Sequence, residues 1–473
     1  MRVRLRDYQE KAVRQIRDAY RAGHRSVLLS LPTGGGKTVI FSYVAEAAVA
    51  KGNRVVVLEH RQELVAQARA TLENLGLSVG LVAPGEPEQP DLPIQVASVQ
   101  SLVRRLPKWK HKFDLIVIDE AHHAVAGSWR KVLDAYPEAH RLGVTATPER
   151  LDGKGLQQFF THLVEGPGTW ELMQRGFLAP CRVFCPPTNT DFRKLRVLAG
   201  DYKKDEAAKE MGKPTLIGDV VKHYKSHLHP GTAIAFCVTV DHARLTAEAF
   251  TAAGVRASVI DGTLDRKRRQ KMIDGLATGE VEVLCSCEII SEGTDVPSVG
   301  GALLLRPTMS LALFLQQVGR CLRPAPGKEH AVVLDHAGNV RRHGLPQDIH
   351  HWSLEGAKER KAQEEKRRDA APVRVCQNCF AAIPLEPVCP YCGHEQPIKT
   401  KPVGIYGEGE LRELKIEEAK IRAREREDQR RRRSQIGKAR TLVELKAIAK
   451  ERGYSPGWAY HIFNARNERG RQL

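Results

Sequence analysis

The sequence lacks long apolar runs, an apolar N-terminal core and a cysteine framework, and each absence excludes a class of protein. No run in the 473 residues approaches the roughly 18 apolar residues of a transmembrane helix, so no membrane partner is expected. The N-terminus, MRVRLRDYQEKAV, is amphipathic and has no signal-peptide core. Ten cysteines are too few for a disulfide scaffold in a chain of this length. We therefore expect an intracellular, cytoplasmic protein.

Composition and charge are consistent with a globular protein that binds a polyanion. Hydrophobic residues make up 42% and charged residues 27% of the chain, which excludes wholesale disorder. Lysine and arginine number 74 against 56 acids, a net charge of +18. Such an excess favours nucleic acid as the partner, and the alternative is a solvated basic surface.

Two stretches alternate short apolar runs with helical patterns, which predicts βαβ units around parallel sheets. We expect an α/β domain in residues 1–165 and a second in residues 166–349. The expected strands are 26–31, 54–58, 94–97 and 115–118 in the first domain, and 233–238, 257–260, 281–285, 302–305 and 331–334 in the second. The first is expected to bind the nucleotide.

After residue 350 the composition changes. We expect a charged linker in 350–372, a small metal-binding ribbon in 373–397, a charged helix or linker in 398–440 and a small helical segment in 441–473. The basic run 430–433 and the aromatic stretch WAYHIFNAR suit single-stranded nucleic acid. The alternative, which we favour, is a helical cap whose aromatic residues form its own core.

A glycine-rich loop, LPTGGGKT at 31–38, lies between a predicted strand and a predicted helix. Consecutive glycines allow the backbone N–H groups to face phosphate oxygens, and the helix N-terminus adds its dipole. Lys37 suits the β- and γ-phosphates of ATP, and Thr38 suits Mg²⁺. The loop residues expected to bind ATP are Thr33, Gly34, Gly35, Gly36, Lys37 and Thr38.

Two carboxylates follow the apolar run in FDLIVIDEAHH, residues 113–123. Asp119 and Glu120 should therefore lie at the carboxyl end of a buried strand, where open α/β sheets bind ligands. Asp119 suits the Mg²⁺ shell, and Glu120 suits polarisation of the attacking water. The alternative is a helix cap with first-turn acids.

Four cysteines form two CxxC pairs separated by nine residues. This spacing favours a tetrahedral, structural Zn²⁺ site whose folding energy comes from the metal. An iron–sulfur cluster and redox cysteines are the alternatives. The expected ligands are Cys376, Cys379, Cys389 and Cys392.

With these motifs the chain resembles the superfamily 2 helicases of the DEAD/DEAH-box type, including the helicase domains of type III restriction Res subunits and of UvrB. The resemblance covers about residues 1–345 and implies two tandem RecA-like domains. Three further stretches, LRPT at 305–308, PGK at 326–328 and LDHAGN at 334–339, resemble bacterial RadD-like helicases and phage-encoded relatives. The motifs run in the family's order as LRDYQ (5–9), LPTGGGKT (31–38), VLEHRQEL (57–64), ASVQSL (97–102), DEAHH (119–123), GVTATPER (143–150), AFCVTVDHA (235–243), SEGTDVP (291–297) and QQVGRCLR (316–323).

The resemblance implies roles for five further residues. Gln9 would read adenine, and Asp295 would contact the ribose or the last motif. Arg323 would act as the arginine finger and Arg320 as a γ-phosphate partner. We expect both arginines on one helix face, three residues apart, with Pro324 ending the helix. Gln316 would contact His122.

The family's nucleic-acid track implies a set of contact candidates, each of which is as readily structural. They are His60, Arg61, Ser98, Gln100, Thr239 and Thr294. The basic stretch 266–271 could add phosphate contacts, but a solvated helix face is the favoured interpretation.

We therefore expect an ATP-dependent DNA helicase or translocase with ATP, Mg²⁺ and structural Zn²⁺. It would act in DNA repair or recombination, in the bacterial cytoplasm at the nucleoid, on single-stranded, branched or duplex DNA without sequence preference. The alternatives are an RNA helicase, the motor subunit of a restriction system whose nuclease lies on another chain, and a binding scaffold with weak ATPase. The ribbon and tail are candidates for a protein partner.

Overall fold

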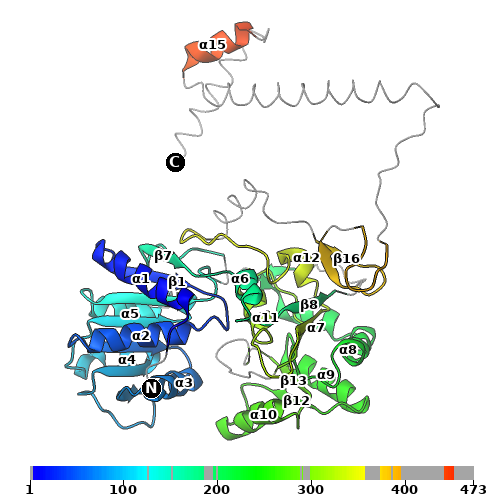
Figure 1. The fold of residues 1–473 in the computed structure, drawn as a ribbon, viewed down its shortest axis with the longest axis horizontal. Coiled ribbons are helices and arrows are strands. Elements are labelled where there is room, and N and C mark those ends of the chain that lie inside the picture. Colours follow the sequence, from blue (N-terminus) through cyan, green and yellow to red (C-terminus); the bar gives the residue numbers. More distant parts are fainter. Residues whose placement is uncertain are drawn as a thin grey trace. The chain divides into compact units, whose positions relative to one another are not determined.

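The structure is a computed structural model (Figure 1). It describes residues 4–124, 127–150, 153–185, 195–198, 201–287, 290, 299–356, 373–384, 387–395 and 441–451. Residues 1–397 form one compact unit and residues 398–473 another, and each is treated by itself. None of the described helices is long and apolar enough to cross a membrane.

The first lobe is built on a seven-stranded parallel sheet of order β3-β4-β2-β5-β6-β1-β7. Its strands are β1 (Ser26–Ser30), β2 (Val55–Glu59), β3 (Val79–Val82), β4 (Ile94–Ser98), β5 (Leu115–Asp119), β6 (His140–Thr145) and β7 (His162–Glu165). Its helices are α1 (Asp7–Arg21), α2 (Lys37–Val49), α3 (Gln62–Asn74), α4 (Val99–Arg105) and α5 (Gly127–Ala135), with short 3₁₀ turns at Leu106–Lys108 and Ala121–His123.

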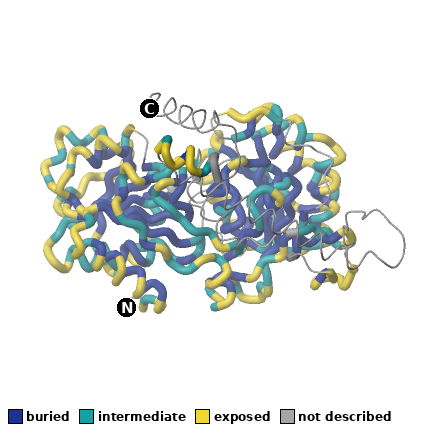
Figure 2. Tube along the Cα trace, turned by 90° about the horizontal axis from the view of Figure 1, so that it is seen from above, coloured by how far each residue is buried: buried dark blue, intermediate teal, exposed yellow. Residues whose placement is uncertain are grey.

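Helices cover both faces of this sheet, which explains why its central strands read as continuous apolar runs. One core contains Ile16, Phe41 and Leu72 from α1, α2 and α3. The core on the opposite face contains Leu102 and Trp129 from α4 and α5. Buried residues fill the interior of each lobe (Figure 2), and in this sheet the strands β1 and β2 are buried along their whole length. The carboxyl ends of β1, β2 and β5 lead into the glycine loop, Glu59 and the Asp119–Glu120 pair, respectively.

The second lobe is a six-stranded parallel sheet of order β12-β13-β11-β14-β15-β8. Its strands are β8 (Cys181–Phe184), β11 (Ala233–Phe236), β12 (Ala257–Ile260), β13 (Val283–Ser286), β14 (Gly301–Leu304) and β15 (Ala331–Asp335). Its helices are α7 (Lys204–Met211), α8 (Pro214–His227), α9 (Val240–Ala252), α10 (Arg266–Thr278), α11 (Leu311–Gly319) and α12 (Asn339–His343). A small hairpin, β9 (Val197–Leu198) with β10 (Asp201–Tyr202), precedes α7.

The expected fold class is confirmed, because two parallel-sheet α/β lobes follow one another along the chain. The first sheet ends with β7 at Glu165, α6 (Thr169–Gln174) follows, and the second sheet starts with β8 at Cys181. The domain limits given above stay predictions. In the two large sheets, four described strands, β3, β6, β7 and β8, lie outside the expected set.

A cysteine-bearing ribbon follows the second lobe, with β16 (Val373–Val375) antiparallel to β17 (Ala382–Pro384). It docks on the edge strand β8 (Figure 1). Phe184 forms an antiparallel bridge with Ala381, and the backbone N–H of Cys185 donates to Phe380 O at 2.9 Å. In the tail, α15 (Leu442–Glu451) is the described helix. The basic run 430–433 and the aromatic stretch after 457 lie outside the described residues.

Gly143 in β6 tests how tightly the first sheet is packed. A Cβ placed there would lie 2.4 Å from Phe160 Cζ and 2.8 Å from Leu28 Cδ1. We expect Gly143→Ala to lower the free energy of unfolding by about 1–3 kcal/mol, measured by urea denaturation. Adding Phe160→Leu should recover part of the loss. The control is Gly218→Ala in α8, where no atom lies within 4 Å, so stability should be unchanged or slightly higher. Equal losses at both glycines would contradict the packing argument.

Candidate nucleotide site between the lobes

The glycine loop joins β1 to α2 and is shaped by three glycines. Gly34 and Gly36 have φ of 84° and 86°, the left-handed region that side chains disfavour. Gly36 is the N-cap of α2, so the helix N-terminus faces the loop. A Cβ on Gly35 would lie 2.7 Å from Leu31 Cγ. The loop therefore needs glycine at each position and can present its backbone N–H groups to phosphate oxygens.

The first turn of α1 braces this loop. The Tyr8 hydroxyl donates to Gly35 O at 2.8 Å, and Gln9 Nε2 donates to the same oxygen at 3.4 Å. Gln9 Oε1 accepts from the backbone N–H of Arg6 at 2.9 Å. Both ends of the Gln9 amide are thus engaged, so adenine recognition would require these bonds to exchange, and that role stays a prediction. Lys37 Nζ, at the start of α2, donates to Leu31 O at 3.3 Å.

Three carboxylates gather where β2 and β5 end. Asp119 is the last residue of β5, and its Oδ1 accepts from the N–H of Glu120 at 2.9 Å. Glu120 has a φ of 45°, which turns the chain sharply into the following 3₁₀ turn. Burial, and then the Glu120 carboxylate, raises the pKa of Asp119 to about 7, while Lys37 opposes that shift. The third carboxylate, Glu59 at the end of β2, did not figure among the expected site residues.

Arg320 and Arg323 come from the second lobe, but the expected helix does not carry them. The helix α11 ends at Gly319, Arg320 is its C-cap, and Arg323 follows in a bend. The expectation of a shared helix face was therefore wrong, because the helix ends before the arginines instead of at Pro324. Burial lowers the pKa of the Arg323 guanidinium.

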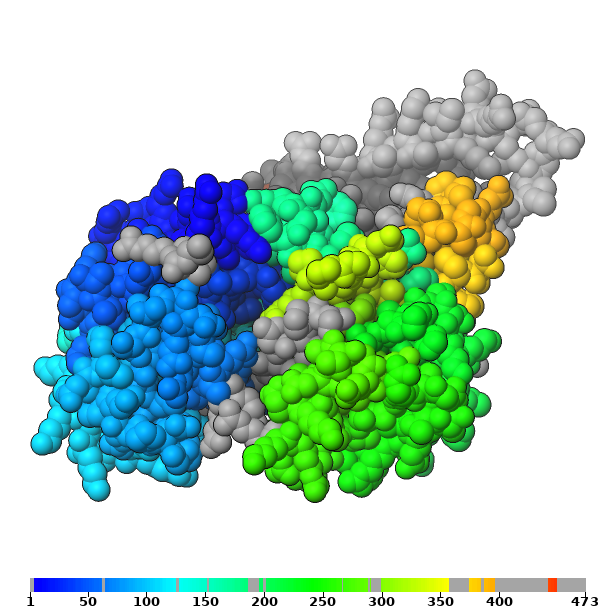
Figure 3. Space-filling model, turned by 60° about the horizontal axis from the view of Figure 1, so that its bottom comes forward, coloured from blue at the N-terminus to red at the C-terminus, as the bar shows by residue number. Residues whose placement is uncertain are grey.

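The lobes are in direct contact beside the glycine loop. A Cβ on Gly319 would lie 2.6 Å from Thr33 Cβ, so only glycine allows this approach. A Cβ on Gly34 would lie 3.6 Å from Arg323 Cγ. Figure 3 shows the first lobe, blue to cyan, beside the second, green to yellow. The turn after α11 thus places both arginines beside the first lobe's phosphate loop.

The result is one cavity of about 310 Å³ lined by both lobes. Lys37, Thr38, Asp119 and Glu120 line it from the first lobe, and Arg320 and Arg323 from the second. This arrangement combines a phosphate cradle, oxygen ligands for a divalent cation and two guanidinium groups. Phosphoryl transfer depends on such positioning and charge stabilisation. The described residues that line it are Thr33, Gly34, Gly36, Lys37, Thr38, Val39, Glu59, Leu64, Gln67, Ala68, Thr71, Asp119, Glu120, Arg320 and Arg323.

A buried polar chain runs from this cavity across the lobe boundary. His122 Nδ1 lies 3.1 Å from Thr145 Oγ1 and 3.4 Å from Glu120 Oε2. Because the Thr145 hydroxyl already donates to Thr147 O at 3.0 Å, Nδ1 is assigned as the protonated nitrogen. Gln316 Nε2, on α11, then donates to His122 Nε2 at 3.4 Å. The chain connects Glu120 to the helix that precedes Arg320.

A second brace holds the entry to α11 and explains the LRPT and LDHAGN stretches. Asn339 Oδ1 accepts from the N–H of Thr308 at 3.0 Å, and its Nδ2 donates to Arg306 O at 2.9 Å. Asp201 accepts from the N–H of Met309 at 2.8 Å and from the Thr308 hydroxyl at 3.1 Å. Sequence reasoning used residues 305–308 and 334–339 only for a family resemblance and did not single out Asp201. In the structure these residues together hold the loop before α11.

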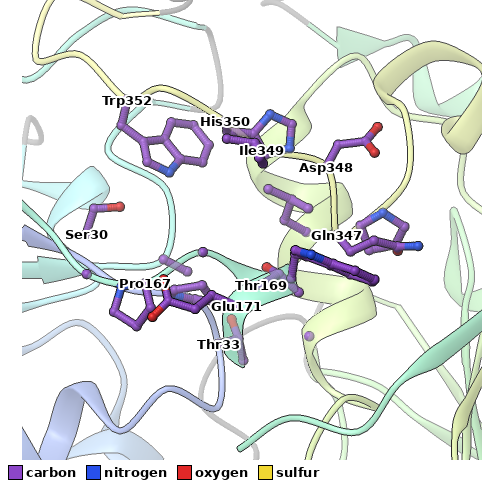
Figure 4. Close-up of a pocket in the computed structure, with 18 of the residues that line it drawn as sticks. Ser30, Thr33, Pro167, Thr169, Glu171, Gln347, Asp348, Ile349, His350 and Trp352 are labelled. Carbon is purple, nitrogen blue, oxygen red and sulfur yellow. The ribbon is translucent and has the colours of Figure 1, made fainter. Parts of the chain in front are cut away.

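A larger cavity of about 420 Å³ contains Thr33 but neither Lys37 nor the three carboxylates of the nucleotide cavity. Trp352 and His350 lie across it from Pro167 and Thr33 (Figure 4). Its described lining includes Glu165, Glu171 and Asp348 but no lysine or arginine to balance the charge of a triphosphate. The smaller cavity, which has Lys37 and two arginines beside its carboxylates, is therefore the better candidate for the phosphate site.

The candidate nucleic-acid contacts are only partly free for that role. Ser98 Oγ donates to Gln100 Oε1 at 3.1 Å. Thr239 is the N-cap of α9 and accepts from the N–H of His242 at 3.2 Å. The imidazole of His60 packs against that of His123, with ring centroids 4.6 Å apart and the rings tilted by 42°. Asp295 and Thr294, with the rest of 291–298, lie outside the described residues. Arg61 is the N-cap of α3, with its side chain half-buried.

The four ribbon cysteines converge, with all four Sγ atoms within 4.8 Å of one another. Cys376 Sγ lies 3.7 Å from Cys392 Sγ, and Cys379 Sγ lies 3.7 Å from Cys389 Sγ. Four sulfurs about 2.3 Å from a tetrahedral zinc ion would lie about 3.8 Å apart. The donor set and its spacing therefore fit Zn²⁺.

Family models match both lobes. Residues 2–150 match the model described as type III restriction enzyme, res subunit, and residues 213–325 match the helicase conserved C-terminal domain. Among solved structures, a fragment of an HsdR subunit of a type I restriction enzyme from Vibrio vulnificus has a TM-score of 0.59 at 22% identity, covering 72% of this chain and 65% of that one. The DNA-bound type ISP enzyme LlaBIII has a TM-score of 0.53 at 17% identity, covering 70% and 28%. These structures establish the shared fold.

Sequence relatives extend the likeness along the chain. A 51.5 kDa protein of a Lactococcus phage is 33% identical over 84% of this chain and 84% of its own length. IRC3 of Saccharomyces cerevisiae, named as an ATP-dependent helicase, is 32% identical over 71% of this chain, which spans about half (51%) of that protein. The DNA 3'-5' translocase XPB2 of Sulfurisphaera tokodaii is 25% identical over 68% and 79%. With two parallel-sheet lobes enclosing a cavity lined by the glycine loop, the Asp–Glu pair and two arginines, the chain belongs to the superfamily 2 helicases, a family of nucleic-acid-dependent ATPases.

Proposed function

We propose that this chain is an ATP-driven DNA translocase or helicase that works in DNA repair or recombination. The observation that carries the proposal is the cavity in which Lys37, Thr38, Asp119 and Glu120 meet Arg320 and Arg323. Four of these groups come from the first lobe and two from the second, so hydrolysis requires the lobes to be closed. Relatives named for DNA translocation and restriction, together with the net charge of +18, favour DNA as the polymer.

The roles follow from the chemistry of the side chains. The loop N–H groups and Lys37 hold the phosphates, and Thr38 with Asp119 would hold Mg²⁺, which neutralises charge on the phosphate oxygens. Glu120 orients the attacking water and accepts its proton. Arg323 stabilises the charge that develops on the γ-phosphate, with Arg320 beside it.

The buried chain from Glu120 through His122 to Gln316 is the proposed coupling element. A change at the γ-phosphate would alter the Glu120–His122 contact and hence the position of α11. Closure and opening of the lobes would then move DNA held across both. The site would serve a phage or bacterial chromosome in the cytoplasm, in line with the phage relative.

A second candidate, the motor subunit of a restriction system, is favoured by the family model that matches residues 2–150. In that case a partner chain would supply the nuclease. The two candidates share the motor, and they differ in whether the isolated chain needs a partner to act on DNA.

DNA should stimulate the ATPase. We expect hydrolysis by the full chain to rise at least tenfold with single-stranded or duplex DNA and to rise less with RNA. In Glu120→Gln the stimulated rate should fall by about 10²–10⁴ because the general base is lost, while ATP binding persists. The exposed Glu86→Gln is the control and should keep the wild-type rate. Equal rates with every polymer, or none with any, would contradict the proposal.

The arginine from the second lobe should be indispensable for turnover. We expect Arg323→Ala to lower the DNA-stimulated rate constant by about 10³–10⁵ and to leave ATP affinity within a few-fold. Arg323→Lys should remain strongly impaired, because an ammonium lacks the planar fork. Arg130→Ala, on the exposed face of α5, is the matched control. A normal rate in Arg323→Ala would remove the arginine finger from the mechanism.

We propose that the ribbon holds one Zn²⁺ through its four cysteines. Metal analysis of the purified chain should give about one zinc per chain, and Cys376→Ser should lose it, since structural zinc supplies the ribbon's folding energy. The control is Cys287→Ser, because Cys287 lies outside the cluster, where its thiol donates to Val238 O at 3.5 Å. Iron absorbance, or zinc retained in Cys376→Ser, would speak against the site. A protein or nucleic-acid partner for the ribbon stays a prediction.

A further inference from the structure

Glu59 lies beside the proposed metal ligand Asp119 in the sheet. The strands β2 and β5 are parallel neighbours, and Leu58 pairs with Ile118, so the next residues along are Glu59 and Asp119. Paired residues of adjacent strands point to the same face of a sheet. Both side chains line the nucleotide cavity together with Thr38.

The Glu59 carboxylate is buried, and one of its oxygens has no hydrogen bond that would compensate for the loss of solvation. Glu59 is 1% exposed, and its Oε2 has no hydrogen-bond partner among the described residues. The rest of β2 is valine and leucine, so an apolar side chain at position 59 would extend the core at no such cost. Since this acceptor lines the cavity, a ligand that enters the cavity can supply the missing hydrogen-bond donor.

The charge of Glu59 limits what that donor is. Phosphate oxygens are acceptors and carry negative charge, so they disfavour the ionised form of Glu59, whereas a divalent cation and its water ligands favour it. Mg²⁺ keeps several water ligands when protein carboxylates and phosphates hold it. Those waters donate hydrogen bonds, and they would surround an ion held by Thr38 and Asp119.

We propose that Glu59 is a positioning residue that accepts a hydrogen bond from a water of the Mg²⁺ shell, and so fixes the cation between Asp119 and the phosphates. This inference rests on the proposed ATPase function. It assigns to the end of β2 a share in cation binding in addition to Thr38 and Asp119. Groups that orient metal ligands from outside the shell typically contribute 10- to 100-fold to metal affinity.

The test is a Mg²⁺ titration of binding of a fluorescent, non-hydrolysable ATP analogue to the full chain. The half-saturating Mg²⁺ concentration should rise about 10- to 100-fold in Glu59→Leu and by a smaller factor in Glu59→Gln, which retains a neutral acceptor. Binding of the same analogue in excess EDTA should stay within twofold of wild type in both variants. The matched control is Glu73→Gln on the exposed side of α3, where the carboxylate pairs with Arg69.

The outcomes separate the two proposals. If wild type shows Mg²⁺-dependent binding and neither variant shifts the midpoint, the role of Glu59 is overturned and the ATPase proposal stands. If wild type shows no Mg²⁺-dependent binding, both are overturned. A purely structural role predicts weaker analogue binding in EDTA and a lower melting temperature with an unchanged Mg²⁺ midpoint. Glu59→Leu keeps the test decisive, because an apolar side chain suits the buried position and preserves the fold.

Discussion

The close approach of Gly319 to Thr33 is the contact on which the remainder of the site depends. Each lobe alone presents an incomplete set of groups: one has a phosphate loop and carboxylates, the other has two guanidinium groups. Because no side chain intervenes at Gly319, the turn after α11 reaches the phosphate loop and the arginines enter the cavity. The chemistry of the nucleotide cavity therefore depends on how closely the two lobes approach each other.

The charges that line the cavity determine which ligand it favours. Three carboxylates converge in a buried space, and burial with mutual repulsion raises the pKa of Asp119 to about 7 and that of Glu59 well above its usual range. Lys37 and Arg320 oppose the shift at Asp119. A site of this kind favours a ligand that carries both signs, with a divalent cation toward the acids and phosphates toward the bases.

Sequence reasoning succeeded for the site residues that directly follow apolar strands. The apolar runs that become β1 and β5 placed the glycine loop and Asp119 with Glu120 at one sheet edge, and the two CxxC pairs predicted a convergent cysteine cluster. It failed where three-dimensional packing decides. The helix α11 ends at Gly319, where the chain packs closely against Thr33 of the other lobe. In the sequence, Glu59 looks like the polar residue that ends an apolar run. The strand β6 was missed because its first two residues are polar and more exposed than the four that follow.

The docking of the ribbon on β8 has a consequence for the fate of the protein when the cysteine cluster is damaged. On one side β8 is hydrogen-bonded to β15, and on the other it meets the backbone at Phe380 and Ala381. Unfolding of the ribbon after oxidation of its cysteines would uncover that edge of β8 with its backbone amide and carbonyl groups. An exposed strand edge is a template on which other chains add strands. The first consequence of oxidising the ribbon cysteines would thus be self-association of the protein through the edge of β8.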